Sequence, residues 1–366
     1  MSEQPPREKA PGRPERILVR GTNWIGDAVM STPALQRLRE SFPSSQIVLM
    51  ATPLTGELFA TSPWVDQFLP YRRREEGWRA FGRMVAQLRA ERFDLAILFQ
   101  NALEAALLVW LAGIPRRIGY EAEGRGWLLT TCLRRGPRHR HQIHDYLDLV
   151  TASVSAAGQR SAESIDRAPL PRLGVGEQAR RDADSLLRAR GVEPGTGPLI
   201  ALNVGATNSR AKCWPADYYA RLADWLASTY GAIIVLIGGP GERALAETVA
   251  SRIDRRAHVV LLAGETSLAA LLGVLESCTL VVSNDTGPAH IAAALGRPVL
   301  TLFGPTNEWE TAPRGAHAAL LRAEGIACAR CMHRDCPIDH RCMTQLSVEQ
   351  VQEEVARLLQ EAGENR

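Results

Sequence analysis

The stretch SNDTGPAHIAAALGRPVLTLFGPT, residues Ser283–Thr306, indicates a strand end, a polar turn, a helix, a second strand and a glycine turn. An apolar run at 280–282 leads into it, and the short polar side chains at 283–285 are typical of a helix N-cap. Residues 286–288 then predict the first helical turn, where proline has no N–H hydrogen bond to lose. The order strand, turn, helix predicts an α/β fold.

The same turn has features of an anion site. A helix start without bulky side chains leaves backbone N–H groups and the positive end of the helix dipole open to a negative group. His290 follows Thr286 by one turn, on the same helix face. The turn therefore predicts half of a nucleotide site, and an ordinary capped helix after a core strand is the alternative.

Length and composition indicate a two-domain protein. The chain has 366 residues and 45% hydrophobic content, enough for two α/β domains with separate cores and a cleft between them. No stretch reaches the ~20 apolar residues of a spanning helix, and the best candidate, Ala102–Ile114, carries Glu104. Residues 1–15 are polar and proline-rich, which predicts a disordered lead-in and no signal peptide. A cytosolic protein is expected.

Positive charge gathers in the first half. Residues 1–150 hold 21 Arg or Lys and 16 Asp or Glu, a net charge of +5, whereas the remainder carries −2. Such clusters indicate an anionic partner, although a solvated face is the alternative. Nucleic acid is weakly supported because the clusters lack interleaved aromatic residues, and an acidic glycolipid at a membrane surface fits as well. The clusters are Arg72, Arg73 and Arg74, the pair Arg116 and Arg117, and the segment 134–140.

Strands and helices alternate through both halves, which predicts two doubly wound parallel sheets. Strands are expected at 16–20, 46–50, 65–69, 94–99 and 117–120, with a helix at 27–40 and a closing helix at 144–156. The polar segment 158–174 is the expected linker, so that the domains are 16–157 and 175–366. In the second, strands are expected at 199–204, 232–237, 258–262, 280–282 and 299–303, and helices at 215–228, 242–253, 268–276 and 286–295.

Glycine-rich turns follow several of these strands, at Gly205, Gly238 and Gly287. Ligands of open parallel sheets bind beyond the carboxyl ends of the strands, so these turns are expected to line one side of the cleft. Lys212 and Lys9 are the only lysines in a chain that otherwise uses arginine. A compact ammonium group can approach a pyrophosphate as a point charge, which makes Lys212 a candidate phosphate contact.

With these features assembled, the chain resembles glycosyltransferase family 9, the bacterial heptosyltransferases of lipopolysaccharide core assembly. The resemblance covers nearly everything after residue 15 and rests on four motifs in order: NWIGDAVMSTPAL at 23–35, KCWP at 212–215, the stretch 283–306, and CARCMHRDCPIDHRCM at 328–343. The first and last of these motifs resemble the heptosyltransferase II subgroup. The resemblance implies a GT-B-like fold of two facing nucleotide-fold domains.

The resemblance also implies an activity. It implies inverting, metal-independent transfer of a heptose, the second of the inner core, from ADP-heptose to a phosphorylated lipid A–inner core acceptor, with no cofactor. Such an enzyme would be cytoplasmic and peripheral on the cytoplasmic face of the inner membrane. The rivals are a family 9 transferase for another sugar or acceptor and a non-catalytic nucleotide-sugar-binding protein.

Site residues carry over by motif. Asp27 falls on the family's proposed catalytic base, Lys212 on the lysine near the donor phosphates, and Thr207 in the loop before it. The family's acceptor contacts include a lysine, and near the corresponding position this sequence has Glu104 instead. Glu242 falls near the adenosine ribose and Thr266 near adenine, and the donor motif corresponds to Asp285, Thr286, Gly287 and His290.

The residue chemistry fits these roles. Transfer from a sugar nucleotide needs a base for the acceptor hydroxyl and stabilisation of the departing diphosphate. The candidate base is Asp27 in one domain. The candidates for stabilising the diphosphate are Lys212 and the helix start at Thr286, both in the other domain. Capping of its own helix is the alternative role for Asp27. Arg72, Arg73, Arg74, Arg116 and Arg117 are candidate grips for acceptor phosphates or carboxylates.

Four of the seven cysteines crowd into residues 328–342. Their spacing, Cys328-x2-Cys331-x4-Cys336-x5-Cys342, is within the range of structural zinc sites but lacks a second CxxC pair. Bound zinc, packed reduced thiols and disulfides are the three readings, and a metal-free segment is the expectation.

Overall fold

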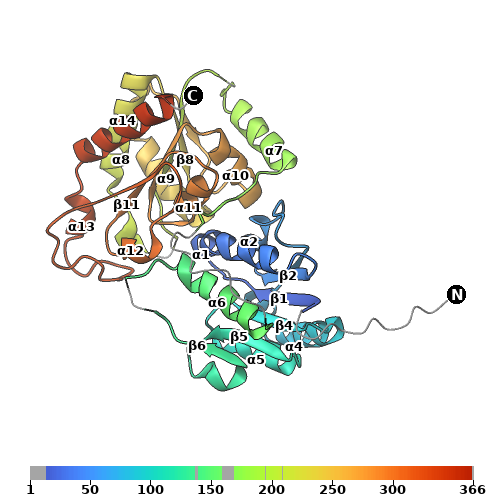
Figure 1. Ribbon diagram of the computed structural model, residues 1–366. Helices are drawn as coiled ribbons and strands as arrows, with labels where there is room; N and C mark the ends of the chain where they lie inside the picture. Colours follow the sequence, from blue (N-terminus) through green and yellow to red (C-terminus); the bar gives the residue numbers. More distant parts are fainter. Residues whose placement is uncertain (1–13, 137–138, 159–168, 194, 208, 365–366) are drawn as a thin grey trace.

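The computed structural model describes residues 14–136, 139–158, 169–193, 195–207 and 209–364. Residues 1–13 of the expected lead-in and 159–168 of the expected linker lie outside these described residues, whereas the backbone N–H of Glu15, the last residue of that lead-in, donates to a carboxylate oxygen of Asp94. Two α/β domains are stacked on one another (Figure 1). Among the residues described, none of the helices combines the length and the apolar character that crossing a bilayer requires.

The first domain is built on six parallel strands in the order β3-β2-β1-β4-β5-β6. The interior positions of its central strands are apolar and buried, because helices cover both faces of the sheet. The strands are β1 (Arg16–Arg20), β2 (Gln46–Ala51), β3 (Gln67–Pro70), β4 (Leu95–Leu98), β5 (Arg116–Tyr120) and β6 (Thr131–Leu133). The helices are α1 (Ile25–Met30), α2 (Thr32–Ser41), α3 (Pro53–Glu57), α4 (Arg73–Glu91), α5 (Leu103–Leu111), η1 (Arg125–Leu128) and α6 (Ile143–Ala156).

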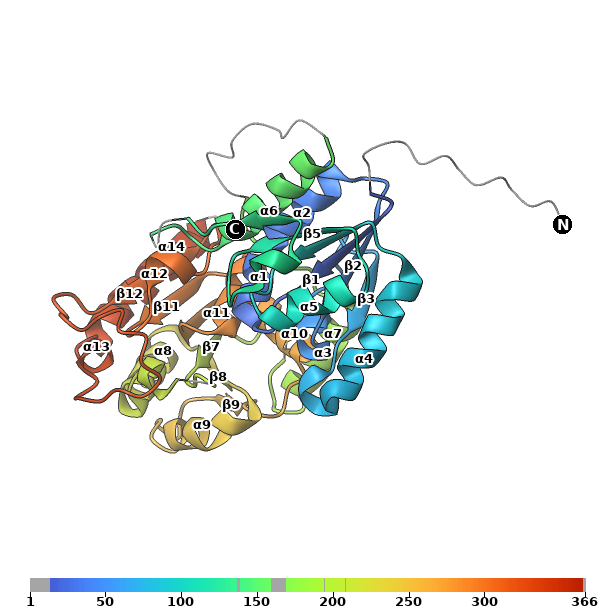
Figure 2. The same ribbon diagram turned by 90° about the horizontal axis from the view of Figure 1, so that it is seen from below.

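Alternate side chains of the sheet enter different apolar layers. Ile17 and Val19 of β1 pack with α2 and α6, on the face turned toward the second domain. Leu18 packs with α4 and α5 on the outer face (Figure 2). Helix α4 bends at Gly77, whose φ of +62° is accessible to glycine without strain.

The second domain repeats the plan, with all strands parallel in the order β12-β11-β10-β7-β8-β9. The strands are β7 (Leu199–Asn203), β8 (Ile233–Ile237), β9 (Val259–Leu261), β10 (Leu280–Asn284), β11 (Val299–Phe303) and β12 (Ala318–Arg322). The helices are α7 (Glu177–Arg188), η2 (Arg210–Lys212), α8 (Ala216–Tyr230), η3 (Pro240–Glu242), α9 (Arg243–Ala250), α10 (Leu268–Ser277), α11 (Gly287–Ala294), α12 (Glu308–Thr311), α13 (Arg341–Thr344) and α14 (Val348–Glu364).

In both sheets the chain first builds strands to one side of its opening strand and then crosses to the other side. The two switch points lie between β1 and β4 and between β7 and β10. A crevice beyond the carboxyl ends of the strands forms at such points and is where ligands bind in this class of sheet. The predicted α/β architecture of two doubly wound domains is confirmed, and it locates both halves of the candidate site.

The domains meet where α1 packs against α11. A Cβ atom on Gly287 would lie 2.8 Å from Cγ2 of Ile25, and one on Gly26 would lie 3.0 Å from Cδ2 of His290. Separate cores were expected. The outer layers are indeed separate, but the inner layers join in one apolar cluster across this junction, because these glycines let the two helices approach closely.

Several element boundaries differ from the prediction. The helix expected at 27–40 is divided at Ser31 into α1 and α2. The strand expected at 280–282 continues to Asn284, so that Thr286 alone is the N-cap of α11. The edge strands β6 and β12 and helix α7 were not predicted. Both strands are only partly buried, and the short β6, TCL, lacks the apolar run that marks the central strands.

Candidate active site at the domain junction

Asp27 is the third residue of α1, in the turn that follows the carboxyl end of β1. Its Oδ1 accepts a hydrogen bond of 3.0 Å from Nε2 of Gln142. The N-cap of α1 is Trp24, and no side chain caps it, so the structure gives Asp27 no capping bond. Burial raises the pKa of Asp27, and the hydrogen bond from Gln142 and the positive charge of Lys212 oppose this rise.

Gln142 connects Asp27 to the second domain. Its Nε2 also lies 2.6 Å from the hydroxyl of Tyr146, and its backbone N–H donates to the carbonyl of Glu310 at 3.0 Å. The preceding residue, His141, places Nε2 2.8 Å from the carbonyl of Ala312. The segment before α6 therefore touches α12 of one domain and the candidate base of the other. No motif in the sequence marks Gln142, which is 115 residues from Asp27.

Lys212 ends the short helix η2 in the second domain. Its Nζ donates to the backbone carbonyl of Asp285 at 2.9 Å and to the Oδ2 atom of the same residue at 3.1 Å. Trp214 fixes this loop, because its backbone N–H donates to Oδ1 of Asn284 and its buried indole N–H donates to the carbonyl of Leu346. The ammonium group is thus positioned at the start of α11.

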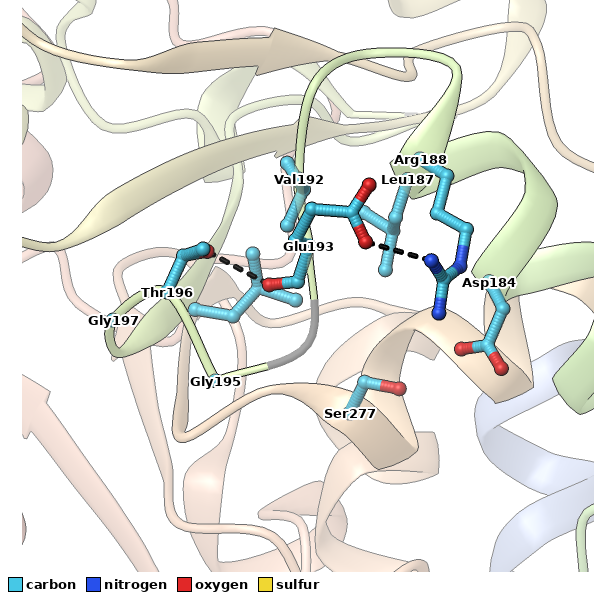
Figure 3. A pocket seen from close by; sticks show the side chains of 10 residues that line it. Asp184, Leu187, Arg188, Val192, Glu193, Gly195, Thr196, Gly197 and Ser277 are labelled. Carbon is cyan, nitrogen blue, oxygen red and sulfur yellow. Dashed lines mark hydrogen bonds and ion pairs between the residues drawn. The ribbon is translucent and has the colours of Figure 1, made fainter.

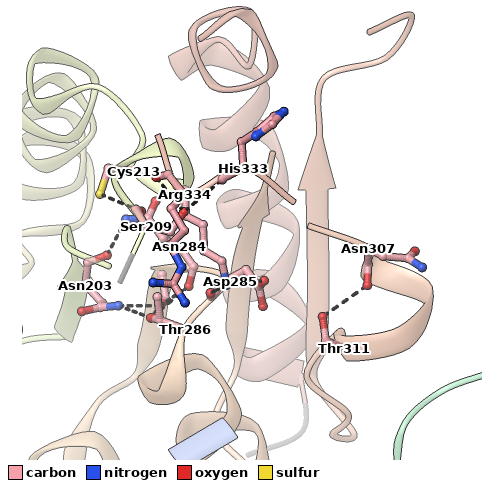
Figure 4. Close-up of polar contacts among 12 residues, drawn as sticks. Asn203, Ser209, Cys213, Asn284, Asp285, Thr286, Asn307, Thr311, His333 and Arg334 are labelled. Atoms are coloured by element: carbon pink, nitrogen blue, oxygen red, sulfur yellow. Dashed lines mark hydrogen bonds and ion pairs between the residues drawn. The ribbon is translucent and has the colours of Figure 1, made fainter. Parts of the chain in front are cut away.

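Asn284 joins the two strands of the second switch point. Its Nδ2 donates to the carbonyls of Val204 at 2.9 Å and Gly205 at 3.1 Å, at the end of β7. Next to it, the hydroxyl of Thr286 accepts a hydrogen bond of 2.6 Å from Nδ2 of Asn203 (Figure 4). These buried bonds hold the turn that opens α11 in one conformation.

The start of α11 is suited to an anion. Thr286 is extended, and no side-chain hydrogen bond caps the helix. Gly287 and Pro288 follow, so the helix itself places no bulky side chain at its positive end. His290 is buried beneath this turn, and burial lowers its pKa to about 4. It is therefore neutral at physiological pH, which leaves Lys212 as the positive side chain at this turn.

The remaining predicted donor residues lie at the carboxyl ends of β7, β8 and β9. Glu242 accepts from the backbone N–H of Gly239 at 2.6 Å and from the hydroxyl of Thr207 at 3.2 Å. A Cβ atom on Gly205 would lie 2.4 Å from Cδ of Glu242, so only glycine leaves room for this carboxylate. Thr266 lies in the loop between β9 and α10. All three residues share the edge that carries Lys212.

Comparison with known proteins shows the family of the chain. A family model described as glycosyltransferase family 9 (heptosyltransferase) matches residues 81–341. Lipooligosaccharide heptosyltransferase 2 of Haemophilus influenzae is 31% identical over 315 residues, which are 84% of this chain and 88% of that protein. The chain belongs to glycosyltransferase family 9. Lipopolysaccharide heptosyltransferase 2 of Escherichia coli is 30% identical over 318 residues, with the same two coverages.

Solved structures of family 9 proteins agree with this assignment. The structure of Escherichia coli ADP-heptose lipopolysaccharide heptosyltransferase II matches with a TM-score of 0.79 at 26% identity, over 94% of this chain and 99% of that one. A family 9 protein from Veillonella parvula matches in fold with a TM-score of 0.81 at 23% identity, over 95% and 97%. The protein is thus a glycosyltransferase, and the predicted GT-B-like fold is confirmed.

The arginines proposed for the acceptor of this family 9 protein separate into two groups. Arg72, Arg73 and Arg74 follow the carboxyl end of β3, on the edge that carries Asp27. Arg72 forms an ion pair with Glu75 at 3.0 Å, and Arg73 one with Glu104 at 3.3 Å. Glu104 also accepts a hydrogen bond of 2.6 Å from the hydroxyl of Tyr71. The carboxylate of Glu104, near the position of the family's acceptor lysine, is therefore already paired.

Arg116 and Arg117 lie elsewhere, because they begin β5 and so occupy the amino edge of the parallel sheet. Nη1 of Arg117 donates to the carbonyl of Ile114 at 2.6 Å, and its Nε donates to that of Leu128 at 2.7 Å. Arg116 donates to the carbonyl of Asp94. The structure therefore places this pair at the edge of the sheet opposite to Asp27. Ligands of such sheets bind at the carboxyl edge, where Asp27 lies.

A cavity of about 230 Å³ lies at the amino edge of the sheet of the second domain. It is enclosed by the ends of α7 and α10 and the segment that leads into β7 (Figure 3). Arg188 and Glu193 form an ion pair of 2.6 Å across it. Its position at the start of β7 separates it from the predicted donor residues at the other end of that strand.

The cysteine-rich segment contains no paired cysteine, and the part of the chain that the structure describes holds no group of His, Cys, Asp or Glu side chains suited to a metal ion. His340 instead places Nε2 2.7 Å from the carbonyl of Ala211, close to Lys212. Cys342 is buried, which raises the pKa of its thiol to about 11.

We expect protein purified without chelators to contain zinc far below one equivalent, because the Cys, His, Asp and Glu side chains of the described residues form no group that could hold the ion. We also expect thiol reagents at neutral pH to modify the exposed Cys328 and Cys331 long before Cys342, since the thiolate is the reactive form. Elemental analysis and mass-mapped labelling measure both. Stoichiometric zinc that resists mild chelation would contradict this expectation and give the segment a metal-dependent fold.

Proposed function

We propose that this family 9 protein transfers heptose from ADP-heptose to the phosphorylated inner core of lipopolysaccharide, as the second heptose. The observation that carries the proposal is the meeting of Asp27, from the first domain, with Lys212 and the α11 start of the second. The similar Haemophilus and Escherichia proteins carry the name heptosyltransferase 2, which supports this substrate and this step.

In the proposed reaction Asp27 removes the proton of the acceptor hydroxyl as its oxygen attacks the anomeric carbon of the donor. A bond forms between that oxygen and carbon, the bond from carbon to phosphate oxygen breaks, and ADP leaves from the opposite face, so that the configuration inverts. A carboxylate whose pKa burial has raised is a stronger base than one in water. No cofactor or metal ion takes part.

The second domain acts on the leaving group in this proposal. Lys212 and the N–H groups that open α11 stabilise the diphosphate charge as it develops. Asp285 orients the ammonium, and Thr286 and Gly287 shape the turn. His290, neutral and buried, packs beneath it. Thr207, Glu242 and Thr266 line the adjoining strand ends and would receive the adenosine.

For the acceptor we propose that Arg72, Arg73 and Arg74 contact phosphates of the inner core, because they share the carboxyl edge with Asp27. Because this acceptor is carried by lipid A, we place the enzyme on the cytoplasmic face of the inner membrane, as a peripheral protein. Contact with nucleic acid forms no part of the proposal.

The donor assignment can be tested by calorimetry with ADP, UDP and GDP. We expect ADP to bind at least about tenfold more tightly, because hydrogen bonds to a base are lost when the base is exchanged. Equal affinities would favour a family 9 transferase for another nucleotide sugar. Binding without any transfer would favour a nucleotide-sugar-binding protein.

Replacing Gln142 by Met is expected to shift the acid limb of the kcat/KM profile to higher pH. The hydrogen bond from Gln142 lowers the pKa of Asp27, so loss of that bond lets the pKa rise further. The carboxyl group of Asp27 then ionises only at a higher pH. Turnover on the alkaline plateau is expected to fall about tenfold, because the base is less well oriented.

A matched control is Gln178→Met, which removes a hydrogen bond of the same kind, to Asp182 at 2.7 Å, on the exposed face of α7. This control is expected to keep the wild-type profile. An unchanged acid limb in Gln142→Met would show that the bond does not set the ionisation of the base.

A further inference from the structure

The outer face of the first domain exposes an unusual amount of aromatic surface. Trp78 on α4 is 69% exposed, Trp110 on α5 is 43% exposed and Trp127 on η1 is 71% exposed. Leu103, at the start of α5, is 40% exposed. Tryptophan is normally well buried, and exposed apolar groups gathered on one face mark a surface for a partner.

These residues lie on neighbouring elements. Helices α4 and α5 run side by side, since Tyr71 just before α4 bonds Glu104 at the start of α5, and Arg89 near the end of α4 donates to the carbonyl of Leu111 at 2.6 Å. Helix α5 also contacts η1. We call the surface of α4, α5 and η1 the outer face (Figure 2).

The aromatic pair on the outer face is held rigidly. The rings of Trp110 and Trp127 lie 6.1 Å apart in an edge-to-face arrangement. The turn that carries Trp127 is fixed by the buried Arg125, which donates to the carbonyls of Tyr120 at 2.9 Å and Gln100 at 2.7 Å. Two indoles are therefore displayed to solvent by a well-anchored turn, and their exposure does not arise from a loose loop.

The outer face lies in the most basic part of the chain. Residues 72–92, which hold α4 and its flanks, contain seven arginines and three acidic residues, a net charge of +4, whereas the rest of the chain carries −1. Arg79, Arg83, Arg89 and Arg92 of this region are exposed on or beside α4. A positive face that meets its own copy would suffer charge repulsion, and a negative surface would complement it.

We propose that the outer face docks on an anionic phospholipid surface, with Trp110 and Trp127 among the headgroups and the arginines of α4 against the phosphates. Indole rings favour the boundary between apolar chains and water, and each arginine near an anionic leaflet adds attraction that salt weakens. The proposal rests on the lipid-carried acceptor of the proposed function.

Docking in this orientation would also serve the site. Helix α5 begins beyond the carboxyl end of β4, and η1 follows that of β5. Asp27 lies on the same edge, beyond β1, which is the neighbour of β4. An acceptor anchored in the docked bilayer would therefore meet the edge of the sheet on which the base lies.

The test is flotation of the full-length protein with phosphatidylcholine vesicles, with and without phosphatidylglycerol. We expect binding only to the anionic vesicles, weakened by salt, and a partition coefficient about tenfold lower in the double variant Trp110→Ala/Trp127→Ala. Trp309→Ala removes a half-exposed tryptophan of the second domain and is expected to bind as the wild type does.

A second variant guards against misfolding. Arg79→Gln/Arg92→Gln changes exposed charges alone and is expected to weaken binding to anionic vesicles as well. Transfer to a delipidated acceptor is expected to be unchanged in both double variants, which separates docking from catalysis and from the proposed function. Wild-type protein that ignores anionic vesicles would overturn the proposal. Two other results would also overturn it. One is concentration-dependent dimerisation that the tryptophan variant abolishes, and the other is oligonucleotide binding without vesicle binding that the same variant abolishes.

Discussion

Replacing Asp27 by Asn is expected to slow heptose transfer by roughly a hundred- to ten-thousandfold, while fold and donor affinity persist. The amide has almost the size of the carboxylate, and its oxygen can still accept the hydrogen bond from Gln142. It cannot take the proton of the acceptor hydroxyl. It also cannot stabilise positive charge that develops at the anomeric carbon.

Asp27→Ala separates catalysis from a structural contribution. A carboxylate in the first turn of a helix contributes about 0.3 to 1 kcal/mol through the helix dipole, so the thermal midpoint of the variant is expected to move by only a few degrees. Single-turnover transfer and thermal unfolding of both variants measure the two effects. Near-normal turnover in the folded Asn variant would remove Asp27 from the role of base.

Replacing Lys212 by Ala is expected to weaken ADP-sugar binding by about ten- to a hundredfold, which corresponds to a charge-assisted contact of roughly 1.5 to 3 kcal/mol. The variant also leaves Asp285 without its cation, and that side chain is only 5% exposed. An unpaired carboxylate beside the phosphates would repel them. The double variant Lys212→Ala/Asp285→Asn is therefore expected to recover part of the lost affinity.

Arg210 provides the control for Lys212. It belongs to the same short helix, but its side chain is 89% exposed and paired with Asp335. Arg210→Ala removes one positive charge two residues away and is expected to leave ADP-sugar affinity unchanged in calorimetry. Equal affinity of wild type and Lys212→Ala would show that the ammonium does not reach the phosphates, and the proposed division of roles between the domains would fail.

The strands and the turn at 283–290 were predictable because each is recorded locally. A buried strand is a continuous apolar run, and the sequence at 283–290 contains both the end of β10 and the start of α11. The break at Ser31 was missed although the sequence records it, because Pro33 lies in the first turn of α2, where proline is favoured.

Gln142 could not be predicted, because its importance comes from two contacts over long sequence separations, one to Asp27 in its own domain and one to Glu310 of the other domain. The placement of Arg116 and Arg117 was predictable and was missed. They begin a strand, and in a parallel sheet that position is the edge away from the ligand. The exposed tryptophans show a further limit, since the sequence of α5 indicates a helix but does not say which face its neighbours leave uncovered.

The most direct test of the whole account is a transfer assay with the purified wild-type protein, ADP-heptose and inner-core acceptors that carry either no heptose or one. Mass spectrometry of the glycolipid reports the product. The account predicts the gain of one heptose on the acceptor that already carries one, with ADP released in equal amount and no dependence on added metal. Absence of transfer to either acceptor, by protein that binds ADP and is folded, would contradict it.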